Sequence, residues 1–311
     1  MAQGIKRFLV IHNPTAGQGN RKRLLRALEV MKRENCEFVI HQTEFPDHAV
    51  QLSRGAAEDG NWTAVVAAGG DGTITEVARG LRGSGVPLGV IPLGTANIFA
   101  REIGVGTSVE KAVRILLAAE PVAVTPGLAG GRRFLLMIGA GYDSLAVQAL
   151  RSDQKRKWGA VAYLLAALRV RSRFHQMVVD IDIAGQRHSA AAAIITRART
   201  YGGPFLLAPD AGLQQPDLQV VLLKRGGLLA AIGYGLALVT GRLSRLKSVE
   251  MLATRGPVLL TSPEEMPCQT DGDSDRFAPL EIMLDDQPLN VLGAFARPLK
   301  QPTNCLVPGR R

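Results

Sequence analysis

Residues 68–76 read AGGDGTITE, and this run decides how the first part of the chain is interpreted. It joins an apolar, strand-like stretch at residues 62–68 to a helix-like stretch at residues 73–81. Its glycines carry no side-chain bulk, so backbone N–H groups can approach a polyphosphate closely. Asp71 would place a carboxylate where Mg²⁺ or an attacking hydroxyl is held. The alternative is a glycine turn with Asp71 as a helix cap, but the strand–loop–helix setting favours a phosphate site.

Two further loops have the same character. NPTAGQG at residues 13–19 follows a buried strand candidate, and no GKS or GKT follows it, so it is not a Walker loop. IPLGTAN at residues 91–97 follows another short apolar run. Either loop alone is about as compatible with an ordinary turn as with a phosphate site. Because the carboxyl ends of parallel strands meet at one edge of a sheet, we expect all three loops to line one site.

The pattern of segments predicts two domains. Residues 1–125 alternate strand-like and helix-like segments, which predicts an α/β domain with a mostly parallel sheet covered on both faces. A Pro- and Gly-rich stretch at residues 121–133 marks the boundary. Residues 126–296 contain many strand-like segments and few helices, which predicts a β-rich second domain. The final segment, residues 297–311, is polar, and we expect it to fray or to pack back on the first domain.

Composition narrows the class of protein. The 37 Lys and Arg residues against 27 Asp and Glu residues favour an anionic partner, although such a surface can also be merely solubilising. Three scattered cysteines without a CxxC pair argue against a zinc site or a disulfide framework and fit a reducing cytoplasm. The apolar stretch at residues 226–240 is about 15 residues long, shorter than the roughly 20 that a membrane span needs. The first residues contain no signal-like core.

Three motifs, in this order and spacing, resemble the diacylglycerol kinase catalytic-domain family, which includes bacterial lipid kinases and the sphingosine and ceramide kinases. The motifs are NPTAG at residues 13–17, GGDGT at 69–73 and PLGTAN at 92–97. Further matches, at residues 157–163, 200–211 and 269–273, extend the resemblance over nearly the whole chain.

The resemblance implies a fold and an activity. The fold would be a phosphofructokinase/NAD-kinase-like α/β nucleotide-binding domain followed by a C-terminal β-sandwich domain for the lipid substrate, with ATP between them. The activity would be transfer of the γ-phosphoryl group of ATP, with Mg²⁺, to a hydroxyl of a membrane lipid such as diacylglycerol or a sphingoid-type lipid. The residues expected to contact ATP are Asn13, Pro14, Thr15, Ala16, Gly17, Thr43, Gly69, Gly70, Asp71, Gly72, Thr73, Ile74, Thr75, Thr95 and Asn97.

Two residues are candidates for the catalytic base. In the bacterial diacylglycerol kinases the proposed base is the acidic residue after Asp-Gly in the second domain, which corresponds to Asp273. The family carries Glu there, and the shorter Asp must lie closer to the hydroxyl or act through water. In the sphingosine kinases the Asp of the GGDGT-like run faces the hydroxyl, which points to Asp71. The choice between them stays open.

Besides Asp273, the chain departs from the family's pattern at a second place, where the family binds a metal ion. The bacterial diacylglycerol kinases hold a Mg²⁺ ion after the second-domain Pro-Asp-Ala signature, where family members often carry Asp-Gly. This chain has Gln215-Pro216 there, which leaves Asp217 as the candidate ligand. Because hard cations prefer charged oxygen ligands, the missing carboxylate puts this ion in doubt.

Two apolar segments suggest a membrane surface. Residues 226–240 are followed by Arg242, Arg245 and Lys247, and residues 155–163 hold three cations beside an aromatic. Apolar helices flanked by cations suit an anionic membrane, and core-packed helices with solvated ends are an equal alternative. We therefore expect a cytoplasmic protein, peripheral at the membrane, that acts on lipid and not on nucleic acid. The lipid's identity and a homodimer stay open.

Two other functions compete. An NAD kinase shares the GGDGT run, but the second-domain motifs favour the lipid kinase. A nucleotide-binding regulator could keep the ATP loops without transferring phosphate. Its support is the Asp at position 273 and the Gln215-Pro216 pair.

Overall fold

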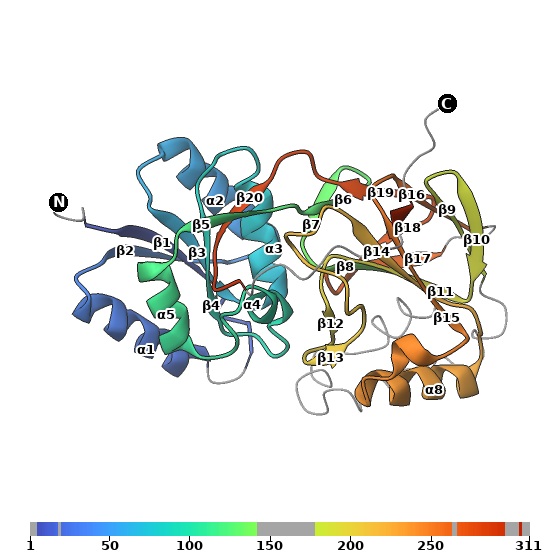
Figure 1. Ribbon diagram of the computed structural model, residues 1–311. Helices are drawn as coiled ribbons and strands as arrows, with labels where there is room; N and C mark the ends of the chain where they lie inside the picture. The colour runs from blue at the N-terminus through green and yellow to red at the C-terminus, as the bar shows by residue number, and fades with distance from the viewer. Residues whose placement is uncertain (1–4, 18–19, 142–177, 263–265, 296–304, 307–311) are drawn as a thin grey trace. The chain divides into compact units, whose positions relative to one another are not determined.

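The computed structural model describes residues 5–17, 20–141, 178–262, 266–295 and 305–306 (Figure 1). The chain forms two compact units. The first unit comprises Met1–Pro126 and Asp286–Arg297, and the second comprises Gly127–Asp285 and Pro298–Arg311. The division lies inside the Pro- and Gly-rich stretch of residues 121–133.

A six-stranded sheet forms the centre of the first unit, in the order β2-β1-β3-β4-β20-β5. Its strands are β1 (Arg7–His12), β2 (Glu37–Gln42), β3 (Ala64–Gly69), β4 (Leu88–Pro92), β5 (Pro121–Val124) and β20 (Leu289–Leu292). All neighbouring pairs are parallel except β20 and β5. Every residue of β3 and β4 is buried, as expected for strands covered on both faces.

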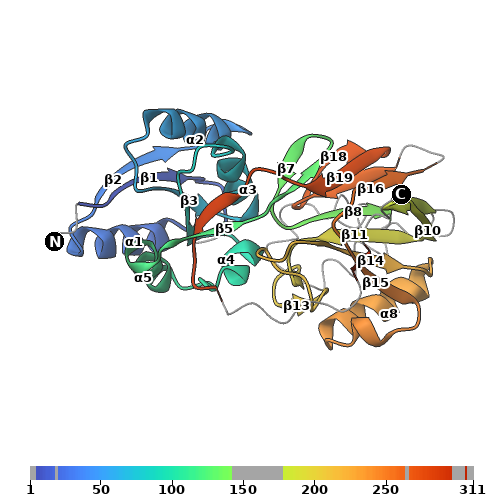
Figure 2. The ribbon, with the colours of Figure 1, turned by 45° about the horizontal axis from the view of Figure 1, so that its top comes forward.

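Helices cover both faces of this sheet. They are α1 (Asn20–Arg33), α2 (His48–Asp59), α3 (Asp71–Gly80), α4 (Ile98–Glu102) and α5 (Val109–Ala118). Figures 1 and 2 show α1 and α5 together on one face, with α2 and α3 on the other. Phe8 and Val10 of β1 pack with Met31 of α1 and Val113 of α5 in one apolar core. The predicted α/β domain is confirmed.

The last strand of the first unit differs from the expectation. Residues 291–296 were expected in the second domain, but the chain returns after Asp285 and inserts β20 between β4 and β5. Val291 of β20 lies opposite Leu88 of β4 and is fully buried. A local sequence pattern identifies such a strand but not its partners, which lie far away along the chain.

Two packed sheets form the second unit, in the orders β10-β9-β16-β19-β6-β7 and β18-β17-β8-β11-β14-β15-β21. Their strands are β6 (Gly127–Ala129), β7 (Arg132–Phe134), β8 (Met137–Gly141), β9 (Val179–Ile183), β10 (Gln186–Ala190), β11 (Ala192–Thr196), β14 (Leu218–Leu223), β15 (Val249–Thr254), β16 (Val258–Thr261), β17 (Pro267–Thr270), β18 (Asp273–Phe277), β19 (Leu280–Leu284) and β21 (Cys305–Leu306). Ile181 and Ile282 of one sheet share a core with Ile195 and Val220 of the other. This arrangement is the predicted β-sandwich.

Smaller elements complete the second unit. They are a hairpin of β12 (Thr200–Tyr201) and β13 (Phe205–Leu206), helix α8 (Leu228–Val239) and the 3₁₀ turn η2 (Leu243–Arg245). Helix α8 lies within the apolar stretch of residues 226–240, whereas the apolar segment at residues 155–163 lies outside the described residues. In the described part of the chain, no helix combines the length and apolarity that crossing a membrane requires.

Two residues of the final segment, Cys305 and Leu306, also differ from the expectation. Residues 297–311 were expected to fray or to pack on the first domain, but β21 pairs in parallel with β15 of the second unit. Ala253 lies opposite Cys305 and Thr254 opposite Leu306.

Candidate functional site

The three glycine-bearing loops of the first unit meet at one edge of its sheet. Strands β1, β3 and β4 are adjacent and parallel, so their carboxyl ends lie side by side. The N–H of Asn13 donates to Ala68 O at 3.1 Å, which ties the first loop to the end of β3. The N–H groups of Leu93 and Gly94 donate to Gly69 O at 2.9 and 3.2 Å. The predicted convergence of these loops is confirmed.

Glycines let the loops touch backbone to backbone. A Cβ on Gly94 would lie 2.6 Å from the Cα of Gly70, so the second and third loops exclude any side chain there. Gly17 adopts a φ of +70°, and a Cβ on it would lie 2.2 Å from Leu93 O. All three loops therefore depend on glycine for close approach.

Side chains inside the loops fix their shape. The Nδ2 of Asn13 donates to Thr73 Oγ1 at 3.1 Å, while its Oδ1 accepts from the N and Oγ1 of Thr15 at 2.9 and 2.8 Å. Asn97, in the left-handed region at φ 47°, donates from Nδ2 to Gly94 O at 2.8 Å. Arg23 donates to Pro92 O at 2.6 Å, so this cation is partly committed to holding the third loop.

The carboxylate of Asp71 holds the start of α4. Its Oδ2 accepts from the N–H of Ile98 at 3.1 Å, and its Oδ1 accepts from the N–H of Phe99 at 2.9 Å. The residue before α4, Asn97, makes no side-chain capping bond to that helix. Asp71 thus caps α4. Through these two bonds its carboxylate ties the second loop to the third.

The expected ATP-contacting residues differ in exposure. Pro14, Thr15, Gly72 and Thr95 are exposed at the loop surfaces. Four others are at most 4% exposed, so their side chains support the loops from within: Thr73, Ile74, Thr75 and Asn97. Thr43, at the end of β2, is half-buried and donates its N–H to His12 O at 2.9 Å.

The N-terminus of α3 supplies positive character. The helix begins at Asp71 after Gly70, which provides no side-chain cap. The first N–H groups of a helix lack intrahelical acceptors, and the helix dipole adds partial positive charge there. Gly72 lies in this first turn, and a Cβ on it would meet no atom within 4 Å. An anion can therefore approach the backbone at this point.

This geometry predicts different effects for two glycine substitutions. Gly72→Ala should keep the unfolding free energy or raise it by up to about 1 kcal/mol, because alanine suits a helix and the site is open. It should weaken ATP binding about tenfold, because the methyl group lies where a phosphate approaches the backbone. Gly94→Ala should lose both stability and ATP binding, because it collides with Gly70. Thermal unfolding and ATP titration measure these effects.

Gly55→Ala in α2 is the matched control, because a Cβ there also meets nothing within 4 Å and lies away from the loops. Its ATP affinity should equal that of the wild type. Wild-type ATP affinity in Gly72→Ala would contradict a phosphate site at the start of α3.

Sequence reasoning did not identify His12, the last residue of β1. It is 5% exposed, and neither ring nitrogen has a hydrogen-bond partner in the described part of the chain. Burial lowers the pKa of its imidazole. The ring is therefore neutral at pH 7, and it adds no positive charge beneath the first loop. A polar residue closing an apolar strand was the only sequence signal.

In the second unit, Asp273 lies at the start of β18, directly after a tight turn. Asp271 and Gly272 form the turn with φ values of 49° and 93°, as an Asp-Gly hairpin turn requires. The side chain of Asp273 is exposed. The residue is therefore accessible to solvent, whereas the carboxylate of Asp71, in the first unit, accepts two backbone N–H groups of α4.

Asp271 fixes this hairpin to the rest of its sheet. Its carboxylate accepts from the N–H groups of Leu135, Leu136 and Met137 at 2.8, 2.8 and 2.9 Å. The N–H of Gly272 donates to Gln269 Oε1 at 2.8 Å. The structure therefore gives Asp271 a positioning role that the motif alone did not reveal.

Asp217, the candidate ligand for a second-domain metal, is a buried residue with a hydrogen-bonded carboxylate. Asp217 is 3% exposed, and its Oδ2 accepts from Gln219 Nε2 at 3.1 Å. Burial raises the pKa of its carboxyl, and the positive charges of Arg197 and Arg255 oppose that rise. Among the described residues, no group of three His, Cys, Asp or Glu side chains could hold a metal ion. The buried guanidinium of Arg197 lies at this loop instead.

Comparisons with known proteins agree with this architecture. The diacylglycerol kinase catalytic domain model matches residues 7–129, and the YegS C-terminal NAD kinase beta sandwich-like domain model matches residues 136–293. The diacylglycerol kinase of Bacillus subtilis is 27% identical over 286 residues, which cover 90% of this chain and 93% of that protein. A Pseudomonas aeruginosa protein named "Probable lipid kinase YegS-like" is 32% identical over 230 residues, covering 70% of this chain and 72% of its own length.

A solved structure supports the fold. The structure of a diacylglycerol kinase from Bacillus anthracis matches with a TM-score of 0.70 at 21% identity, over 94% of this chain and 98% of that one. From both family models, the relatives and the fold together, the chain belongs to the diacylglycerol kinase catalytic-domain family.

Proposed function

We propose that this chain is an ATP-dependent lipid kinase, which transfers the γ-phosphoryl group of ATP to a hydroxyl of a membrane lipid. The observation that supports it most is the convergence of three glycine-bearing loops with the uncapped start of α3 at one sheet edge. Membership of a lipid kinase family supports the same activity.

Each part of the first unit has a chemical role in this proposal. Phosphoryl transfer depends mainly on positioning and on stabilising charge on the transferred group. Backbone N–H groups of the loops and the start of α3 would bind the phosphates of ATP, which arrives with Mg²⁺ as part of the substrate. The exposed hydroxyl of Thr95 would add a donor. Asp71 would keep the second and third loops in register through α4.

Asp273 would act as the general base in the second unit. Its exposed carboxylate stands on a hairpin that Asp271 anchors through three backbone N–H groups. It would accept the proton of the lipid hydroxyl as that oxygen attacks the γ-phosphorus, and ADP would leave.

The decisive experiment supplies γ-labelled ATP, Mg²⁺ and a total lipid extract to the purified protein. We expect label in the organic phase, and chromatography of the labelled product identifies the lipid class. A parallel reaction with NAD as acceptor tests the NAD kinase alternative. ATP binding without transfer to lipid or NAD would contradict the proposal and support a nucleotide-binding regulator.

We further propose that α8 contacts an anionic membrane surface. The helix contains no charged residue, and the side chains of Leu229, Leu236 and Val239 are 87%, 63% and 55% exposed. Its opposite face is anchored, because the hydroxyl of Tyr234 donates to Ser248 O at 3.2 Å. Exposed cations flank the helix at Arg225, Arg242, Arg245 and Lys247. An apolar face between cations suits the boundary between acyl chains and acidic headgroups.

The double variant Leu229→Glu/Leu236→Glu should lower binding to phosphatidylglycerol-containing vesicles by more than about tenfold. Burying each leucine contributes about 1.5–3 kcal/mol, and glutamate adds repulsion from anionic lipid. Vesicle sedimentation measures the bound fraction. Leu25→Glu, at a leucine 50% exposed on α1, is the control and should sediment like the wild type. Wild-type sedimentation of the double variant would contradict this surface.

A further inference from the structure

The side chain of Arg197 is fully buried in the second unit, directly after β11. Among the residues that the structure describes, it is the largest side chain that is fully buried. Its guanidinium donates to the carbonyl oxygens of Leu213 and Gln215 at 3.0 and 2.7 Å, and also to that of Asp217. One planar cation thus satisfies three acceptors of a single loop.

Backbone carbonyls that converge on one point, beside a carboxylate, resemble the oxygen shell of a hard divalent cation. The acceptors are alternate residues of one loop, and the carboxylate of Asp217 is nearly buried next to them. A metal would have to displace the guanidinium or share these oxygens with a second positive charge. The three carbonyl oxygens already accept from a buried guanidinium, so the loop suits that cation and not a metal.

We propose that Arg197 is an internal cation that replaces a structural metal ion in the second unit. It holds residues 213–217 in place, and this loop leads directly into β14, a buried strand of the seven-stranded sheet. A side chain is part of the folded chain, so the loop forms at any concentration of divalent cation. The proposal concerns folding and does not depend on which reaction the protein catalyses.

Wild-type protein without nucleotide provides the first test. After dialysis against EDTA, elemental analysis should find no stoichiometric Mg²⁺ or Ca²⁺. The Tm should be the same in EDTA, in Mg²⁺ and in Ca²⁺, because an ion that binds only the folded state would raise it. A retained ion, or a Tm that rises with either ion, would overturn the proposal. Leaving ATP out keeps substrate-bound Mg²⁺ from affecting the result.

Substitutions provide the second test. Arg197→Ala should lower the Tm by more than about 5 °C, because three carbonyls, two of them in buried hydrogen bonds, lose their donor. Arg187→Ala, at an exposed arginine of β10, is the matched control and should leave the Tm unchanged. A wild-type Tm in Arg197→Ala would overturn the proposal. If Arg197→Ala does not fold, the metal dependence of the wild-type Tm still decides.

The double variant Arg197→Ala/Gln215→Asp tests the replacement directly, because it removes the cation and adds a carboxylate. Its Tm should rise with Mg²⁺ or Ca²⁺, whereas that of the wild type should not. A double variant indifferent to both ions would contradict the idea that the guanidinium lies where an ion could bind.

Discussion

Asp273→Asn is expected to lower kcat by about 10²- to 10⁴-fold and to leave ATP affinity close to the wild-type value. The amide keeps the size of the side chain but cannot accept the hydroxyl proton. The position is exposed, so the substitution should not disturb packing. Transfer of labelled phosphate to lipid measures kcat, and ATP titration measures binding.

Two comparison variants make this result specific. Asp273→Glu should keep substantial activity, because it restores the residue that the family carries. Asp71→Asn should show the opposite pattern, with a lower Tm and weaker ATP binding, because an amide is a poorer acceptor for the N–H groups of Ile98 and Phe99. Wild-type turnover in Asp273→Asn would mean that another group accepts the proton.

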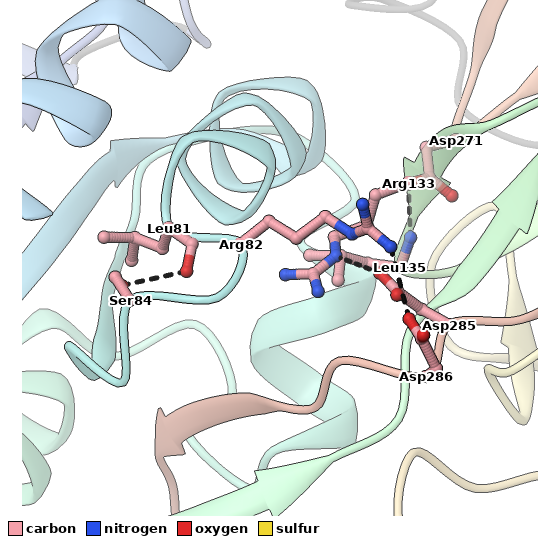
Figure 3. Close-up of polar contacts among 8 residues, drawn as sticks. All are labelled: Leu81, Arg82, Ser84, Arg133, Leu135, Asp271, Asp285 and Asp286. Atoms are coloured by element: carbon pink, nitrogen blue, oxygen red, sulfur yellow. Dashed lines mark hydrogen bonds and ion pairs between the residues drawn. The ribbon is translucent and has the colours of Figure 1, made fainter.

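Asp285→Ala is expected to lower the free energy of unfolding by about 3–5 kcal/mol, the largest stability effect that we predict. The side chains of Arg133 and Asp285 are 1% and 0% exposed, and Arg133 Nε lies 2.7 Å from Asp285 Oδ2 (Figure 3). Removing the carboxylate deletes this buried ion pair and leaves the guanidinium of Arg133 in place. Urea unfolding followed by circular dichroism measures the loss.

The adjacent residue provides the control. Asp286, in the first unit, pairs with Arg82 at 3.3 Å, and the two side chains are 84% and 39% exposed. Asp286→Ala should therefore cost less than about 1 kcal/mol. The double variant Arg133→Met/Asp285→Leu should recover most of the loss, because it removes both buried charges together. Equal losses in Asp285→Ala and Asp286→Ala would show that burial does not set the strength of these pairs.

Local sequence patterns were sufficient to predict much of the fold of the first unit. The apolar runs of β1, β3 and β4 are continuous because both faces of these strands are buried. Parallel strands bring their carboxyl ends to one edge, so the convergence of the loops followed from strand order alone. The two-sheet second unit followed from its many short strand-like segments.

Those local patterns could not predict which strands pair when the strands are far apart in the sequence. Strand β20 belongs to a sheet whose other strands all lie in residues 7–124, and β21 pairs with β15. The burial of Arg197 was likewise unexpected, because an arginine between apolar strands and a Gly-rich loop usually reaches solvent. Its three acceptors come together only when the loop before β14 folds over it.

By itself, the sequence determined the family, the two kinds of domain and the glycines of the three loops. These features depend on residue type and on local spacing, and both can be read from the sequence alone. Only the tertiary structure decided that the carboxylate of Asp71 caps α4 while Asp273 is exposed, and that Arg197 is buried against the loop of Asp217. The reason is physical: the role of a charged side chain depends on its burial and on its hydrogen-bond partners, and folding brings those partners from other parts of the chain.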